Sequence, residues 1–412
     1  MRSCSRRACS GGCQLFWAGS RGFPHVLNKT FLKLAAPLAV GALALTGCGS
    51  DSGGGGGGDT VRIAFQGPLS GDNVQLGTNM ENGIKLAIEE ANASGDYDFE
   101  VEYLPADDQG KPDKATAAAQ KAISEGAIAV IGPAFSGAAD TAGEVYAEAG
   151  IPAVSSSATR PDLTTKGYGT FLRAVPNDSA QGAGMAKYFD QATDAEKVVV
   201  VDDKTDYGVG LADVAEKELK AVGIDVVRQS VPQKAPDYTA AAKSVVGQKA
   251  DGLIYAGYYE DAGPFAKKLA SEGFDGIAMS GDGSNDMGFV KLAGEAANDW
   301  KLTCPCTDPT QEEATKKFAT DYEKKFKQAP GTYSAESYDV AKMIIEQVAK
   351  TGGADSDSEK LMEALRGVEY KGLTKTFSFD DKGEFKNQTI YLYEVKDQKI
   401  GYVGNIDELG AE

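Results

Sequence analysis

A repeated alternation of short apolar runs and helical runs after residue 59 is the feature that most constrains the fold. The predicted strands cover residues 61–65, 99–104, 127–131, 151–155, 197–202, 224–229, 252–256 and 276–279, and the predicted helices cover 80–93, 115–125, 138–149, 182–191, 210–221, 238–246 and 262–271. Continuously apolar strands are typical of a parallel sheet with helices on both faces. Because the alternation occurs in two series, we predict an α/β protein with two doubly wound parallel-sheet lobes.

Length and charge narrow the class of protein further. A chain of 412 residues exceeds what one core normally contains, so at least two folded units are expected. The net charge is −18, and the first 47 residues contain six basic and no acidic residues, which leaves −24 on the remainder. A surface of that sign repels phosphate backbones and anionic lipid headgroups, so we expect no nucleic-acid partner.

The first 58 residues are predicted to direct export and anchoring. The apolar run 34–47 follows two lysines, ends in small residues and is too short to span a bilayer, so residues 1–47 are expected to be a signal peptide. Its end, Leu45-Thr46-Gly47-Cys48, resembles the lipobox of bacterial lipoproteins, which implies a lipid on Cys48. The Gly-rich stretch 49–58 is then a flexible tether. We therefore expect an extracytoplasmic protein anchored to the outer face of the bacterial cell membrane.

The chain lacks the residues that most kinds of catalytic site require. His25 is the only histidine and lies in the leader, which argues against Ser-His-Asp, Cys-His and His-ligated metal sites. The series Asp282, Ser284, Asp286 imitates a calcium loop, but the twelfth position is Ala293 and supplies no carboxylate. We expect no enzyme activity, no metal and no cofactor. Outside the leader and the lipobox only Cys304 and Cys306 remain, either as free thiols or as a local disulfide.

Small and hydroxylic residues gather where the predicted strands end. The loops are 67–71, 132–137, 155–159, 202–208, 257–259 and 280–283. Serine or threonine at a helix start usually only caps that helix. In open α/β sheets, however, ligands lie beyond the carboxyl ends of the strands, where helix N-termini favour an anion. The convergence of these loops therefore predicts a site that holds a carboxylate.

Motifs in these loops resemble a known family in order and spacing. They include Gly67-Pro68-Leu69-Ser70-Gly71, Asp107-Asp108, Val130-Ile131-Gly132 with Ser136, Pro152 through Pro161, Phe171-Leu172-Arg173, Asp178, Gln181-Gly182, Asp206-Tyr207-Gly208, Gly257-Tyr258, Gly283 and Phe379 through Gly383. Residues 61–400 are similar to the leucine/isoleucine/valine-binding proteins of ABC transporters, which have the type I periplasmic binding fold.

The resemblance implies two lobes joined by three crossovers, near Asp178, 303–307 and 373–377. Lobe 1 would comprise 59–178 plus 307–375, and lobe 2 would comprise 179–306 plus 376–412. In this family the lobes close over one amino acid, and the closed form is delivered to permease subunits. A monomer is expected. The alternative is a ligand-sensing, receptor-type module for amides, short peptides or other small polar solutes.

The family pattern also implies which loops of lobe 1 contact the ligand. Ser136 and Thr159, with backbone groups at Ser157 and Ala158, would hold the carboxylate and part of the ammonium group. Phe135 precedes Ser136 in the same loop and is included in the predicted site.

The remaining predicted contacts come from lobe 2 and from Leu76. Tyr207, Tyr258 and Asp282 would approach from lobe 2, and Asp282 would pair with the α-ammonium group. The branched-chain binders present a glutamate at the position of Asp282, so the preferred solute could instead be a polar amino acid, an amide or a short peptide. An aromatic residue often borders the pocket where this chain has Leu76, which predicts a roomier site.

Overall fold

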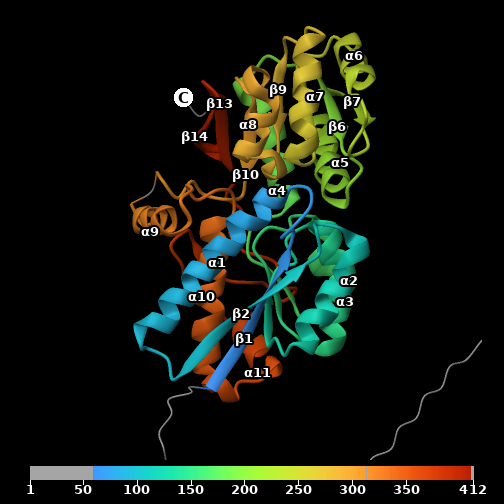
Figure 1. The fold of residues 1–412 in the computed structure, drawn as a ribbon. Helices are drawn as coiled ribbons and strands as arrows, with labels where there is room; N and C mark the ends of the chain where they lie inside the picture. The colour runs from blue at the N-terminus through green and yellow to red at the C-terminus, as the bar shows by residue number, and fades with distance from the viewer. Residues whose placement is uncertain (1–58, 312, 410–412) are drawn as a thin grey trace, which may run out of the picture. The chain divides into compact units, whose positions relative to one another are not determined.

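The structure, a computed structural model, describes residues 59–311 and 313–409 (Figure 1). The predicted signal peptide, the lipid site at Cys48 and the tether up to residue 58 lie outside the described residues. No helix within 59–311 and 313–409 is both long enough and apolar enough to cross a bilayer.

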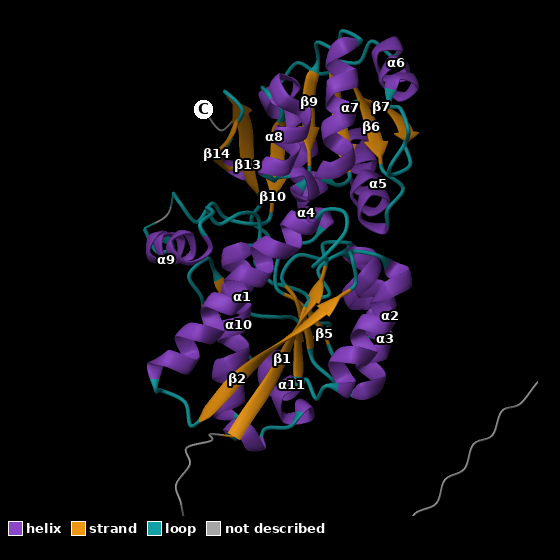
Figure 2. Cartoon of the chain, viewed as in Figure 1, coloured by secondary structure: helices purple, strands orange, loops and turns teal. Residues whose placement is uncertain are grey.

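A five-stranded parallel sheet forms the centre of the first lobe (Figure 2). Its order is β2 (Phe99–Asp107), β1 (Asp59–Gly67), β3 (Ala129–Ile131), β4 (Ala153–Ser155) and β5 (Phe171–Arg173). In the register of β1, Ile63 lies opposite Tyr103 on one side and Ala129 on the other. Because β1 is central rather than at an edge, the chain crosses over the sheet after β2, as in a doubly wound fold.

Successive side chains of β1 point to opposite faces of the sheet, and both faces are covered by helices. Ile63 and Phe65 pack into one apolar cluster and Ala64 into another, on the opposite face. One face is covered by α1 (Val74–Ser94) and α10 (Ser334–Lys350), the other by α2 (Pro112–Ser124) and α3 (Ser136–Ala149) (Figure 1). Helix α11 (Ser358–Arg366) packs against α10.

A seven-stranded sheet forms the second lobe. Its order is β14 (Lys399–Asn405), β13 (Tyr391–Lys396), β10 (Lys301–Cys304), β9 (Ile277–Ser280), β8 (Gly252–Ala256), β6 (Lys197–Asp202) and β7 (Asp225–Ser230). Its helices are α4 (Asp178–Ala192), α5 (Asp206–Ala221), α6 (Thr239–Gly247), α7 (Tyr259–Ser271) and α8 (Met287–Ala293). Strands β6 to β10 are parallel, whereas β13 is antiparallel to both β10 and β14. The predicted parallel series is therefore extended by the parallel strand β10 and by the antiparallel hairpin of β13 and β14, none of which the sequence analysis identified.

Three passages of the chain connect the lobes. The first runs from β5 into α4, and the second runs from β10 through a disulfide between Cys304 and Cys306 toward α9 (Lys316–Phe326) and α10. The third runs from the hairpin of β11 (Tyr370–Lys371) and β12 (Thr376–Phe377) to β13. The disulfide resolves the alternative that the sequence left open.

Buried polar contacts hold the second passage in place. The Thr307 N–H donates to the Glu336 carboxylate at 2.9 Å, and Lys375 Nζ donates to the Pro305 carbonyl at 2.9 Å. Glu336 and Lys375 are both buried and 3.4 Å apart, so the charge of each is compensated by the other.

Candidate functional site

Loops at the carboxyl ends of both sheets enclose a small buried cavity, called here the cleft pocket. Its walls are Leu76, Met80, Ala134, Phe135, Ser136 and Ser157 from the first lobe, Tyr207, Tyr258, Asp282 and Gly283 from the second, and Tyr333 just before α10. The cavity volume is about 10 Å³, room for about one water molecule. Seven of the nine ligand-contact residues that the sequence suggested line this pocket.

Asp282 is the charged centre of the cleft pocket. It begins a short 3-10 turn directly after β9 and is 4% exposed. Its Oδ1 accepts hydrogen bonds from the Tyr207 hydroxyl at 2.9 Å and from Gln181 Nε2 at 3.0 Å, and its Oδ2 accepts one from the Tyr333 hydroxyl at 2.8 Å. Burial raises the pKa of Asp282, and the three donors oppose that rise because they stabilise the carboxylate.

A capped helix start positions the two tyrosines of the second lobe. Thr205 caps α5 by accepting from the Gly208 N–H, and Asp203 accepts from Thr205 and from the Tyr258 N–H at 3.2 Å. The Tyr207 hydroxyl accepts from the Gly283 N–H at 3.1 Å while it donates to Asp282. Tyr207 is therefore fixed at both its backbone and its hydroxyl group.

The first lobe contributes the start of helix α3. The first intrahelical bond is donated by the Ala139 N–H to the Phe135 carbonyl, so the N–H groups of the preceding turn are not used inside the helix. Ser136 is the first residue of that turn, and its hydroxyl accepts from the Arg160 N–H at 3.3 Å. Such a turn favours an anion beside it.

Two predicted residues are not on the pocket wall. The Ala158 N–H donates to the Ser155 hydroxyl at 3.0 Å and the Ala158 carbonyl accepts from Arg173, so its backbone groups are used within the lobe. Thr159 is fully buried, its carbonyl accepts from the Asp178 N–H, and its hydroxyl has no hydrogen-bond partner among the described residues. Neither residue is among those that line the cleft pocket, whereas Ser157 is.

Gln181 and Tyr333 were missed as partners of Asp282. They lie 101 and 51 residues from it in the chain, so no local motif joins them to it. Tyr333 has a φ of +63°, which is uncommon for a bulky side chain and directs attention to the turn before α10. The Gln181-Gly182 pair was noted as part of the family pattern but was not assigned to the site.

A second buried carboxyl lies near Asp282. Asp178, the first residue of α4, is fully buried and its N–H donates to the Thr159 carbonyl at 2.9 Å. Burial raises its pKa well above the ordinary value, and the charge of Asp282 raises it further. When two buried carboxyls are neighbours, ionisation of both is unfavourable, and a cation placed beside them is stabilised.

Aromatic rings fill the space between the lobes at the outer side of the pocket. Phe135 stacks on Tyr258 with centroids 4.4 Å apart, and Tyr207 lies 5.0 Å from Tyr258. The roomier site expected from Leu76 is not found, because the cavity that Leu76 borders has a volume of only about 10 Å³.

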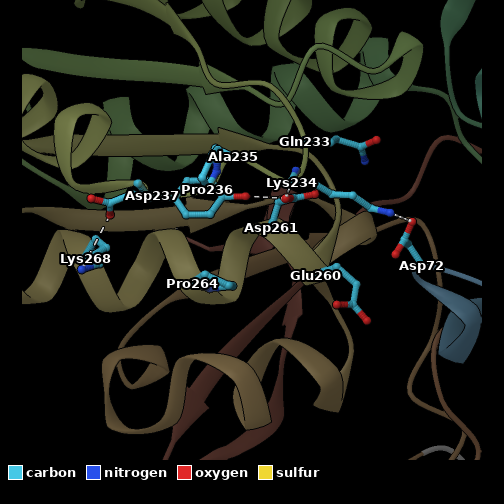
Figure 3. Close-up of a pocket in the computed structure, with 11 residues that line it drawn as sticks. Asp72, Gln233, Lys234, Ala235, Pro236, Asp237, Glu260, Asp261, Pro264 and Lys268 are labelled. Carbon is cyan, nitrogen blue, oxygen red and sulfur yellow. Dashed lines mark hydrogen bonds and ion pairs between the residues drawn. The ribbon is translucent and has the colours of Figure 1, made fainter.

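Several polar contacts join the lobes around the cleft. Lys234 pairs with Asp72 at 2.5 Å, beside a surface cavity that also contains Glu260 and Asp261 (Figure 3). Elsewhere the Asn79 side chain donates to Asp286 at 3.0 Å, and Arg160 donates to Asp206 at 3.0 Å. Among the described residues, no group of three or more His, Cys, Asp or Glu side chains could hold a metal ion.

Comparison with known proteins identifies the family. Residues 60–399 match the sequence model of the family described as "Periplasmic binding protein". The chain belongs to the periplasmic binding protein family. This confirms the resemblance inferred from the loop motifs, the two-lobed α/β fold, and a function in binding rather than catalysis.

Among relatives of this periplasmic binding protein is the leucine-, isoleucine-, valine-, threonine- and alanine-binding protein of Pseudomonas aeruginosa. It is 27% identical over 86% of this chain and 94% of its own length. The Leu/Ile/Val-binding protein homolog 1 of Brucella melitensis is 30% identical over 82% and 91%. The solved LivJ protein of Streptococcus pneumoniae, in complex with isoleucine, is 27% identical with a TM-score of 0.76, covering 84% of this chain and 99% of that chain.

Proposed function

We propose that this protein is the extracytoplasmic solute-binding component of an ABC transporter and captures one aliphatic amino acid, of the branched-chain or a related type, at the cleft pocket. Because the pocket has a volume of only about 10 Å³, the lobes have to part to admit the ligand. The observation that carries the proposal is Asp282, a buried carboxylate supported by three donors at the meeting of the two lobes. A buried carboxylate needs a cationic partner, and the α-ammonium of an amino acid supplies one. The contact is worth roughly 1.5 to 3 kcal/mol.

The other walls of the pocket fit the rest of an amino acid. The first turn of α3 at Ser136 suits the α-carboxylate, because free N–H groups and the helix dipole favour an anion. Leu76, Met80 and Ala134 form an apolar side that suits an aliphatic side chain. The named relatives bind leucine, isoleucine, valine, threonine or alanine, which supports this ligand class.

Asp282 is shorter by one methylene than the glutamate of the branched-chain binders. Its three hydrogen-bond donors hold it on the second lobe, so the ligand's ammonium group has to approach that lobe closely. We infer that the bound amino acid lies nearer to Tyr207 and Tyr333 than it would beside a glutamate.

Aromatic acids are a second candidate because of the neighbours in fold. A solute-binding protein of Rhodopseudomonas palustris in complex with benzoate has a TM-score of 0.76, but at 21% identity the likeness concerns the fold alone. Benzoate carries no ammonium group, and the buried Asp282 would repel its carboxylate. The charge of the pocket therefore favours an amino acid.

Calorimetry on residues 59–412 tests the proposal. Alanine, valine, leucine, isoleucine and benzoate are titrated into the wild type and into Asp282→Asn, and circular dichroism checks that the variant is folded. We expect an aliphatic amino acid to bind the wild type and to lose roughly 10- to 150-fold in affinity with Asp282→Asn. Binding of benzoate alone, or equal affinity in the variant, would refute the amino-acid assignment.

We also propose the lobe boundaries, the lipid anchor and the permease partner that the sequence suggested. The lobes would move about the three passages, with lobe 1 as 59–178 plus 307–375 and lobe 2 as 179–306 plus 376–412. A lipid on Cys48 would hold a monomer beside membrane permease subunits. Replacing Cys48 by alanine in the full chain should release the protein from the membrane fraction of expressing cells, and retention there would argue against the anchor.

A further inference from the structure

Phe135 lies between two separate cavities of the cleft. The inner one is the cleft pocket. The outer one, called here the outer cavity, has a volume of about 240 Å³ and opens beside polar residues that include Asp72, Lys111, Lys204, Asp206 and Gln233. Three side chains border both cavities, and these are Phe135, Tyr207 and Tyr258.

The ring of Phe135 is held in place from two sides. Its plane lies 22° from that of Tyr258, at 4.4 Å between centroids, so the rings stack across the cleft. On the other side is Gly110, where an added Cβ would lie 2.6 Å from the ring. Phe135 is 7% exposed and has an extended backbone just before α3. Because Gly110 has no side chain, the ring occupies the space that a Cβ at this position would need.

The three shared side chains differ in what else they do. Tyr207 is tied to Asp282 and Gly283 through its hydroxyl, and the Tyr258 backbone is tied to Asp203. Phe135 has no polar group on its side chain, so its contribution to the wall is its volume. It also belongs to the first lobe, as does the apolar side formed by Leu76, Met80 and Ala134.

From this geometry we propose that Phe135 determines specificity by setting the upper size of the ligand side chain. The pocket of about 10 Å³ widens only as far as the lobes part, so the wild type takes short aliphatic amino acids such as alanine and valine in preference to methionine and phenylalanine. The proposal rests on the function proposed above and narrows its substrate class. Shortening Phe135 joins the cleft pocket to the outer cavity, so longer side chains gain space while the ammonium and carboxylate contacts stay unchanged.

Calorimetry with a series of side-chain lengths tests the assignment. Alanine, valine, leucine, methionine and phenylalanine are titrated into residues 59–412 as wild type, Phe135→Ala and Phe135→Leu. Phe326→Ala is the matched control, because Phe326 is half-buried at the end of α9 and borders neither cavity. Circular dichroism and the melting temperature without ligand establish that each variant is folded.

We expect the affinity ratio of methionine or phenylalanine to alanine to rise roughly tenfold or more in Phe135→Ala, since hydrophobic pockets discriminate by about that factor per methylene. Phe135→Leu should give a smaller rise, and Phe326→Ala none. If Phe135→Ala does not fold, the ratio in Phe135→Leu decides. If the folded Phe135 variants still bind amino acids but the affinity ratio is unchanged, the role of Phe135 is overturned and the proposed function is not. A wild type that binds no amino acid would overturn the proposed function as well.

Discussion

The Asp282 carboxylate differs from an exposed one because each of its hydrogen bonds comes from a different part of the chain. Tyr207 lies in the first turn of α5, Gln181 lies in α4 and Tyr333 precedes α10. The carboxylate therefore holds together elements that meet only after folding. Loss of one donor leaves the other two in place, so we expect it to lower amino-acid affinity only in part.

Replacing Tyr333 with phenylalanine removes one of these donors and little volume. We expect amino-acid affinity to fall by about 3- to 12-fold, the equivalent of one hydrogen bond, because Asp282 is then held less firmly. Calorimetry measures the loss. Tyr370→Phe, at a tyrosine outside the cleft pocket, serves as the control and should bind as the wild type does. An affinity equal to that of the wild type in Tyr333→Phe would show that this hydroxyl does not support the site.

Asp108 carries a prediction on pH because burial raises its pKa to about 6. Its pKa in the folded protein lies above the ordinary value of 3.8 for an aspartate, so the native state binds the proton more tightly than the unfolded state does. Its contribution to stability is therefore largest below about pH 4 and is lost as the pH rises through 6.

Denaturant unfolding of the wild type and Asp108→Asn between pH 4 and 7 measures that contribution. The free energy of unfolding of the wild type should fall relative to that of the variant by on the order of 2 to 3 kcal/mol over this range. Asp72→Asn, at a partly exposed residue, provides the comparison for a general effect of charge removal. A constant difference between wild type and Asp108→Asn from pH 4 to 7 would refute the shifted pKa.

Helices α1 and α10 approach closely at a glycine. A Cβ added to Gly83 would lie 2.1 Å from the Ser334 carbonyl oxygen, which belongs to the backbone of α10 and cannot rotate away. We expect Gly83→Ala to lower the free energy of unfolding by about 1 to 3 kcal/mol through this overpacking. Gly247→Ala is the matched control, because nothing lies within 4 Å of the added carbon and a neutral or slightly stabilising effect follows. Equal stability of the two variants would contradict the close packing.

Most of the parallel strands could be predicted from sequence, whereas the short parallel strands β5 and β10 and the antiparallel hairpin of β13 and β14 could not. Strands such as β8 are continuously buried and read as uninterrupted apolar runs. Strand β14 alternates exposed and half-buried residues, and its turn to β13 consists of Asp397 and Gln398 at positive φ. That turn lacks the Asn-Gly or Asp-Gly signal of a two-residue hairpin.

Similar limits apply to the candidate site. Ser136, Tyr207 and Asp282 lie in loops at strand ends, where the resemblance to a family was strongest. The stack of Phe135 on Tyr258 joins residues of different lobes and leaves no pattern in the sequence. Thr159 has the right residue type in the right loop, but only the packing shows that it is fully buried and does not line the cleft pocket.

Across the whole molecule, ion pairs at the edge of the cleft connect the two lobes. Arg160 of the first lobe pairs with Asp140 and Asp162 of the same lobe and with Asp206 of the second lobe. Lys234 of the second lobe pairs with Asp72 of the first. The Arg160–Asp206 and Lys234–Asp72 pairs exist only when the lobes are together, so they favour the closed arrangement. Their exposure limits each contribution.

Asp206→Asn should therefore weaken amino-acid binding modestly, by about two- to fivefold. The effect should shrink as salt is raised, because exposed charges are screened. Calorimetry at low and high salt provides both values. Lys217→Ala removes an exposed pair within one helix and should leave affinity unchanged. A loss in Asp206→Asn that does not depend on salt would show that the side chain acts through something other than its charge.

The position of β10 has a consequence for how the protein is made. Its neighbours are β9, which precedes it, and β13, which follows some 90 residues later, after α9, α10 and α11 of the first lobe. During synthesis β10 is thus an unpaired edge until residues 391–396 have emerged. A nascent chain that stops near residue 390 would expose this edge to neighbouring copies. The second lobe must be completed last, and premature termination is expected to yield aggregates rather than a smaller soluble protein.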